Sequence, residues 1–295
     1  MYPNYIEPLF RPPSEARSLI IQVTNGCSYN QCSFCEMYTA PQKKFRPKPE
    51  PELMAEIEQL GRSYPQTRRI FLADGDAMVL SGRRLLAILQ QLRRSFSELQ
   101  RVTAYCLPRN LNNKTDAELA ALQREGLDML YVGAESGDDT VLAKVDKGET
   151  FETTKVALNR LAEAGIRRSV MILNGLGGRL YSQQHALNSA RLANATQPEY
   201  LSTLVVSFPT GEDRFREAFG GDYEPLSQIE LFYEMKQLIG ELELNKTVFR
   251  SDHASNYLVL KGILGRDKAK MLDQINQAIH QPGRVPLRPE WARGL

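Results

Sequence analysis

Three of the four cysteines lie within nine residues, at Cys27, Cys32 and Cys35, while Cys106 stands alone. Three thiolates on one loop can ligate three corners of an iron–sulfur cluster, because its irons prefer soft sulfur ligands. The fourth iron would then be open to a small molecule. A structural zinc site with His253 as its fourth ligand is the alternative on spacing alone. We interpret Cys106 as a small apolar core residue.

The composition narrows the class of protein. Hydrophobic residues make up 42% and charged residues 24% of the 295 residues, which argues against disorder, collagen and coiled coil. The net charge of +2 gives no sign of a nucleic-acid-binding protein. No apolar run approaches the length of a membrane span, and the start lacks a signal-peptide layout. We expect a cytoplasmic protein with no nucleic-acid or membrane partner.

Short apolar runs alternate with helical patterns along most of the chain. The runs lie at residues 19–24, 70–73, 102–105, 129–132, 170–173 and 203–206. Each is almost unbroken in apolar character, as expected of strands covered on both faces. Six strand–helix units in a row predict an α/β fold with a parallel sheet, namely a partial (β/α)6 TIM-like barrel.

The helical segments carry recognisable signals. Leu85, Ile88 and Leu92 follow the spacing that places side chains on one helical face. Thr115 and Glu118 form a capping-box pattern that predicts a helix start. After about residue 210 the alternation lapses and two further helical patterns follow. We therefore predict a core at residues 17–210 and a C-terminal helical extension at 211–295 that caps the barrel.

The loop after the first predicted strand resembles a known motif. The segment from Asn25 to Cys35 is similar to the cluster-binding loop of the radical S-adenosylmethionine (radical SAM) superfamily, and Phe34 before the last cysteine also fits. Four residues separate the first two cysteines, where the common pattern has three. The resemblance covers about residues 17 to 210 and extends to the Elongator- and coproporphyrinogen-oxidase-like radical SAM cores. It implies a [4Fe–4S] cluster on Cys27, Cys32 and Cys35, with SAM as second cofactor.

Three later segments resemble the SAM-binding motifs of that family. Asp74, Gly75 and Asp76 stand where the family has a Gly-Gly-Glu-like segment that receives the amino group of SAM. Glu135 and Ser136 lie in a Gly-x-Glu-Ser-Gly segment, and Asn174 opens a glycine-rich stretch like the one near the adenine. The resemblance implies that these residues, together with Phe34, contact SAM.

The resemblance also implies a reaction. The reduced cluster would cleave SAM to a 5′-deoxyadenosyl radical, which would abstract a hydrogen from an unidentified small-molecule substrate. The electron would come from a donor such as flavodoxin or ferredoxin. Without a second cysteine group or a cobalamin signature, the sequence disfavours methylthiotransfer and cobalamin-dependent methylation.

The substrate contacts are less well marked. The segment from Phe249 to Tyr257 resembles the carboxyl-terminal signature of a group of bacterial radical SAM proteins, and within it Arg250, His253 and Asn256 are our candidate substrate contacts. An ordinary polar turn explains the same residues about as well. The basic residues from Lys43 to Lys48 could reach an anion, but we interpret the lysines as a solvated loop.

Two alternative functions remain open at this point. One is a haem-handling or other non-catalytic binding protein of radical SAM ancestry. The other is a structural module stabilised by zinc.

Overall fold

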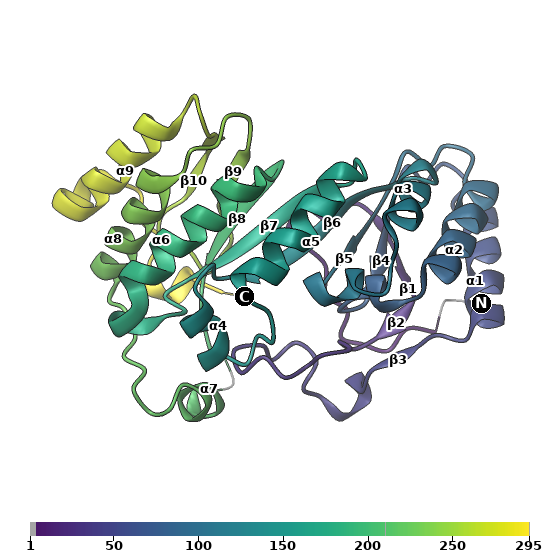
Figure 1. Ribbon diagram of the computed structural model, residues 1–295, viewed down its shortest axis with the longest axis horizontal. Coiled ribbons are helices and arrows are strands. Elements are labelled where there is room, and N and C mark those ends of the chain that lie inside the picture. The colour runs from purple at the N-terminus through teal and green to yellow at the C-terminus, as the bar shows by residue number, and fades with distance from the viewer. Residues whose placement is uncertain (1–3, 210, 295) are drawn as a thin grey trace. The chain divides into compact units, whose positions relative to one another are not determined.

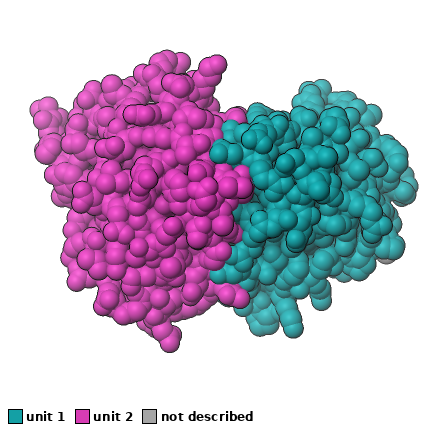
Figure 2. All heavy atoms as spheres, in the orientation of Figure 1, with its two compact units in different colours: residues 1–30, 37–132, 159–168 teal, residues 31–36, 133–158, 169–295 magenta. Residues whose placement is uncertain are grey.

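The computed structural model describes residues 4–209 and 211–294 (Figure 1). The chain divides into two compact units, which Figure 2 shows in different colours. The first unit consists of Met1–Asn30, Met37–Val132 and Asn159–Arg168, and the second of Gln31–Glu36, Gly133–Leu158 and Ser169–Leu295. Residue 210, where the predicted core ends, lies outside the described residues.

The main sheet has the strand order β1-β4-β5-β6-β7-β8-β9-β10 (Figure 1). Its strands are β1 (Leu19–Gln22), β4 (Arg69–Ala73), β5 (Arg101–Tyr105), β6 (Leu127–Glu135), β7 (Arg167–Asn174), β8 (Tyr200–Val205), β9 (Val248–Ser251) and β10 (Leu260–Ile263). Parallel pairs join β1 to β4, β4 to β5 and β5 to β6, and likewise β7 to β8 and β8 to β9. Among the described residues β1 and β10 are the two edges, so no pairing closes a barrel. The predicted partial barrel is confirmed as an unclosed sheet.

The first unit places three helices beside its strands. These are α1 (Glu50–Ser63), α2 (Gly82–Ser95) and α3 (Asp116–Arg124), and α2 packs against both of the others. Leu85, Ile88 and Leu92 are buried on α2, and the capping box of Thr115 and Glu118 begins α3, both as predicted. The first apolar run divides, because β2 (Thr24–Asn25) leaves the main sheet and pairs with β3 (Arg46–Pro47).

The second unit contains the predicted C-terminal helices. Its helices are α4 (Asp139–Lys144), α6 (Gly178–Thr196), α7 (Asp213–Ala218), α8 (Gln228–Glu241) and α9 (Lys268–His280), and α5 (Phe151–Glu163) runs through both units. Helix α8 packs against α6 and α9. Short 3₁₀ helices lie at Pro13–Glu15, Pro41–Lys43, Ala77–Val79, Pro108–Leu111, Pro282–Arg284 and Glu290–Ala292.

Strands β9 and β10 were not indicated by the sequence patterns. Each has four residues, and Arg250 in one and Lys261 in the other interrupt their apolar character. Strand β9 continues the parallel sheet beside β8, and β10 pairs with it in the antiparallel direction. The C-terminal extension therefore adds strands as well as helices.

The carboxyl ends of parallel strands lie at a common edge, which is where α/β proteins bind ligands. In the first unit, the ends of β1 and β4 lead into the segments that contain Cys27 and Asp76. In the second, β7, β8 and β9 end at Asn174, Val205 and Ser251. In the described part of the chain, no helix has the length and hydrophobicity needed to cross a membrane.

Candidate functional site

An acidic side chain just beyond the end of β4 holds the residue next to Cys27. Oδ1 of Asp76 accepts the backbone N–H of Ser28 at 2.9 Å, and Oδ2 accepts the Ser28 hydroxyl. The side-chain amide of Asn110 donates to the same Oδ2 at 3.3 Å. Burial raises the pKa of the Asp76 carboxyl, although the hydrogen bonds from Ser28 and Asn110 oppose the rise. Asp76 therefore fixes the start of the cysteine loop from the interior of the first unit.

Gly75 lies against the same loop. Its N–H donates to the carbonyl oxygen of Gly26 at 3.1 Å. A Cβ at this position would lie 2.9 Å from the Cβ of Cys27 and equally close to the ring of Tyr38. Any larger residue would push Cys27 aside, so the close approach of the two segments requires glycine.

Asp74 is engaged by a buried lysine. The ammonium of Lys43 forms an ion pair with Oδ2 of Asp74, and both side chains are fully buried. The N–H of Gly26 lies 3.4 Å from the same oxygen. Burial raises the pKa of Asp74, while the hydrogen bond and charge of Lys43 lower it. The interpretation of Lys43 as part of a solvated loop is wrong, because its charge is paired inside the first unit.

Cys32 and Cys35 lie on one tight turn of the second unit. The N–H of Cys35 donates to the carbonyl oxygen of Cys32 at 3.2 Å, and the N–H of Ser33 donates to Val145 at 3.0 Å. Both cysteines are partly exposed. Phe34, between them, is partly buried and packs on a cluster of apolar side chains. The turn thus carries two sulfur donors on a segment that the rest of the unit supports.

No three or more His, Cys, Asp or Glu side chains among the described residues are grouped closely enough to hold a metal ion. Cys27 belongs to the first unit, whereas Cys32 and Cys35 belong to the second. Cys106 is buried at the end of β5, in agreement with its interpretation as a core residue. As donors, the three partly exposed thiols suit the irons of an iron–sulfur cluster, which bind soft ligands.

Glu135 is buried at the end of β6 beside Lys147. Its Oε1 lies 3.2 Å from the Lys147 ammonium, and its Oε2 is buried without a hydrogen-bond partner. Burial lowers the pKa of Lys147, but the charges of Glu135, Cys32 and Cys35 outweigh this effect and raise it. Glu135 is therefore a buried side chain whose Oε1 forms an ion pair with Lys147 and whose Oε2 is available to a ligand.

Ser136 begins a buried polar chain through the second unit. Its hydroxyl lies 2.8 Å from Nδ1 of His185 on α6, and Nε2 of His185 lies 4.0 Å from Oε1 of Glu234 on α8. Glu234 also accepts the backbone N–H of Gly175 at 2.6 Å and the hydroxyl of Ser182. Burial raises the pKa of Glu234, against the charge of His185. This chain ties the segments that contain Ser136 and Gly175 to helices α6 and α8.

Asn174 and Asn256 line one small pocket of the second unit. The cavity has a volume of about 20 Å³ and an apolar wall from strands β8 and β10 and helix α8. Asn174, Ser251 and Asn256 line it, and each has a side-chain oxygen that is buried without a hydrogen-bond partner: Asn174 Oδ1, Ser251 Oγ and Asn256 Oδ1. The two amide oxygens can only accept, so a donor of a bound molecule or of water would satisfy them, whereas the Ser251 hydroxyl can donate or accept.

The other two candidate substrate residues do not line this pocket. Arg250 is exposed, and its neighbours Phe249 and Ser251 on β9 are buried. His253 is partly buried, and its Nδ1 lies 3.0 Å from the hydroxyl of Ser255. Burial and the charge of Arg288 lower the pKa of His253.

Six residues of these networks were not predicted, Ser182 among them. The other five are Ser28, Asn110, Lys147, His185 and Glu234. Lys147 follows Glu135 by twelve residues in a polar segment before α5, and nothing in that segment distinguishes it. Ser28 lies in the cysteine loop itself, and the others are single polar residues in helices.

Comparison with known proteins connects these features. The model of the radical SAM superfamily matches residues 21–193, more than half of the chain. This range contains the three clustered cysteines and every residue that we expect to contact SAM.

Individual relatives are distant. The heme chaperone HemW of Bacillus subtilis (strain 168) is 21% identical over 181 residues, which are 59% of this chain and 47% of HemW. Among solved structures, the radical SAM methyltransferase TsrM of Kitasatospora setae is 21% identical, with a TM-score of 0.52 over 63% of this chain and 34% of TsrM. HemN of Escherichia coli, a coproporphyrinogen III oxidase and radical SAM enzyme, is 14% identical, with a TM-score of 0.51 over 92% of this chain and 70% of HemN.

The chain thus spans less than half of HemW and about a third of TsrM. At these identities the structural neighbours show the fold, and the family model supplies the membership. The chain belongs to the radical SAM superfamily.

Proposed function

We propose that the protein is a radical SAM enzyme that cleaves SAM reductively and abstracts hydrogen from a small-molecule substrate. Cys27, Cys32 and Cys35 hold a [4Fe–4S] cluster, and a cytoplasmic donor such as flavodoxin or ferredoxin reduces it. Residues 17–210 are the core and residues 211–295 cap it. The observation that carries the proposal is the anchoring of the Cys27 loop by Asp76 and Gly75, within the segment that matches the family.

The chain's own residues supply position and exclude water. When bound, the cluster and SAM supply the one-electron chemistry that yields a 5′-deoxyadenosyl radical. Asp76 keeps Ser28, and with it Cys27, in place, while the turn of Cys32 and Cys35 provides two further sulfur ligands. The thiols are the soft donors that the cluster requires.

Glu135 is the proposed SAM contact with the strongest support. A buried carboxylate oxygen without a partner is costly, so a hydrogen-bond donor of SAM at Oε2 would be favourable. Lys147 neutralises the other oxygen, and its ammonium suits a carboxylate such as that of SAM. The remaining proposed contacts are Phe34, Asp74, Gly75, Asp76, Ser136 and Asn174.

The substrate is proposed to meet the C-terminal segment through Arg250, His253 and Asn256. The unpaired Oδ1 of Asn256 supports this for one of the three residues, because a hydrogen-bond donor of the substrate would satisfy it. The small size of the pocket suits a single donor group of the substrate rather than its whole body.

The test is the formation of 5′-deoxyadenosine. Anaerobically reconstituted protein is incubated with SAM and dithionite, and the nucleoside is quantified by liquid chromatography. We expect it from the wild type and from Cys106→Ala, and not from Cys32→Ala. Cluster-loaded wild-type protein that makes none would contradict the proposal.

A haem-handling role is the second candidate, favoured by the similarity to the heme chaperone HemW. Titration with haem, followed by visible absorption, distinguishes the two. Stoichiometric haem binding by a protein that forms no 5′-deoxyadenosine would favour the second candidate.

A further inference from the structure

Arg214 on helix α7 contacts the turn that carries Cys32 and Cys35. The guanidinium of Arg214 donates to the carbonyl oxygen of Cys32 at 2.9 Å and to that of Cys35 at 3.2 Å. It also lies 3.4 Å from the carbonyl oxygen of Gln31. One side chain, 182 residues away from Cys32 in sequence, therefore spans the whole turn.

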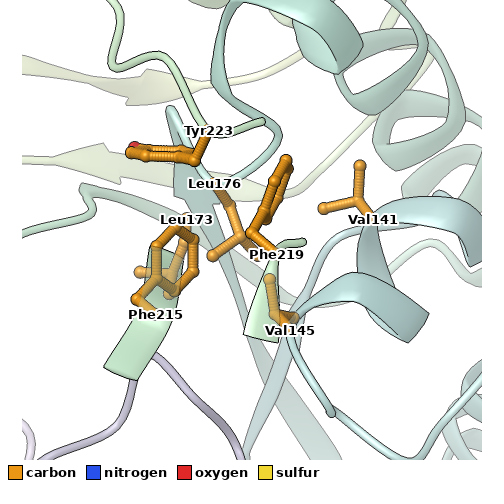
Figure 3. Close-up of a cluster of buried hydrophobic side chains, with 7 residues drawn as sticks. All are labelled: Val141, Val145, Leu173, Leu176, Phe215, Phe219 and Tyr223. Atoms are coloured by element: carbon orange, nitrogen blue, oxygen red, sulfur yellow. The ribbon is translucent and has the colours of Figure 1, made fainter. Parts of the chain in front are cut away.

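Aromatic packing holds α7, the helix that carries Arg214, in place. Phe215 and Phe219, from α7 and its end, pack with Tyr223 and with Leu173 and Leu176 at the end of β7 (Figure 3). The ring centroids of Phe215 and Tyr223 are 4.7 Å apart, and those of Phe219 and Tyr223 are 5.2 Å apart.

The turn itself rests on the same packing. Phe34, which lies between Cys32 and Cys35, packs on this apolar cluster. The ammonium of Lys144 on α4 reaches the carbonyl oxygen of Phe219 at 2.8 Å and so ties α4 to the end of α7. Helix α7 and the cysteine turn are therefore joined by apolar and by polar contacts.

We propose that Arg214 is a positioning residue for the cluster, which fixes the turn of Cys32 and Cys35 and favours the reduced state of the iron centre. This inference rests on the proposed ligation of a [4Fe–4S] cluster by these cysteines. Reduction adds negative charge, and a cation fixed beside two ligands stabilises that charge. Hydrogen bonds to groups that carry metal ligands orient those ligands and tune the metal.

Three variants separate positioning from charge. Arg214→Gln removes the charge and most of the contacts. Arg214→Lys keeps the charge, but a single ammonium cannot reproduce the forked contacts of a guanidinium. The matched control is Arg216→Gln, because Arg216 lies on the same helix and contacts Glu212 and the carbonyl oxygen of Tyr223 instead.

The first readout needs no cluster. Hydrogen exchange, measured by mass spectrometry on the protein without iron, follows the backbone amides of residues 31–36. We expect exchange at least tenfold faster in Arg214→Gln and a smaller increase in Arg214→Lys, with the Arg216→Gln control unchanged. Wild-type exchange in both Arg214 variants would overturn the positioning role, even if no variant binds a cluster.

The second readout is the midpoint potential of the cluster, from a redox titration followed by electron paramagnetic resonance. In Arg214→Gln we expect reduction to become about tenfold less favourable, which for one electron is about 59 mV. Arg214→Lys and Arg216→Gln should keep the wild-type potential. An unchanged potential in a fully loaded Arg214→Gln variant would overturn the electrostatic role, whereas a wild type that binds no cluster would refute the proposed function instead.

Discussion

Asp76 binds Ser28 across 48 residues of sequence, through the backbone N–H at 2.9 Å and through the hydroxyl. The acidic residue of the Gly-Gly-Glu-like segment therefore braces the loop that begins with Cys27. At the preceding residue, Gly75, the backbone lies so close to Cys27 that a side chain would not fit. The segment of Gly75 and Asp76, which we expect to contact SAM, thus also supports the loop of Cys27.

Replacing Asp76 by alanine should cost stability. The N–H and hydroxyl of Ser28 would lose their acceptor, and an unsatisfied group of this kind costs roughly 1–3 kcal/mol. We expect the free energy of unfolding in urea to fall by this amount and cluster loading to fall with it. Asp222→Ala, at an exposed site, is the control. Equal stability of the two variants would show that the contact does not support the loop.

Replacing Glu135 by glutamine should weaken SAM binding. The loss of one charge-assisted contact is worth roughly 1.5–3 kcal/mol, or one to two decades in the dissociation constant. Calorimetric titration of cluster-loaded protein measures the change. Glu152→Gln, on the exposed side of α5, should leave the affinity as it is. A wild-type affinity in Glu135→Gln would remove this residue from the SAM site.

Replacing His185 by leucine should destabilise the second unit. The Ser136 hydroxyl and the Glu234 carboxyl, both buried, would lose a polar neighbour. We expect a loss of roughly 1–3 kcal/mol in the free energy of unfolding. His280→Leu at the exposed end of α9 is the matched control. Identical urea midpoints for both variants would mean that the buried chain contributes nothing to stability.

Glu230, near the start of α8, should make the free energy of unfolding depend on pH in the acid range. Hydrogen bonds from Arg179 and Ser227 lower the pKa of Glu230 from 4.5 to about 2. Because the pKa is lower in the folded state, this stabilisation is complete above pH 4.5 and is lost as the pH falls toward 2.

Glu230→Gln removes that stabilisation at every pH. The gap in melting temperature between variant and wild type should therefore narrow as the pH is lowered through this range. Glu241→Gln, exposed at the other end of the helix, should show no such narrowing. A constant gap for Glu230→Gln would contradict the assignment.

The sequence predicted the six strands of the core well, because each contains a short apolar run, although β8 is mostly only partly buried. It did not indicate β9 and β10, since Arg250 and Lys261 interrupt the apolar character of these two short strands. Strand β9 pairs with β8, about fifty residues earlier in the chain, and β10 pairs with β9.

The polar networks were harder to predict than the motifs. Lys43 in a basic loop has the appearance of a solvated residue, and only the approach of Asp74 gives it a buried partner. His185 and Glu234 each stand alone in a helix, and they meet through the packing of α6 on α8. Motifs are local in sequence, whereas these contacts depend on how distant elements pack.

The iron and acid-labile sulfide content of anaerobically purified protein tests whether the three clustered cysteines hold the cluster. Ligation by these cysteines predicts the proportions of one [4Fe–4S] cluster per chain, a sharp fall in Cys27→Ala, Cys32→Ala and Cys35→Ala, and normal content in Cys106→Ala. Stoichiometric zinc without sulfide, or loss of the cluster in Cys106→Ala alone, would contradict it.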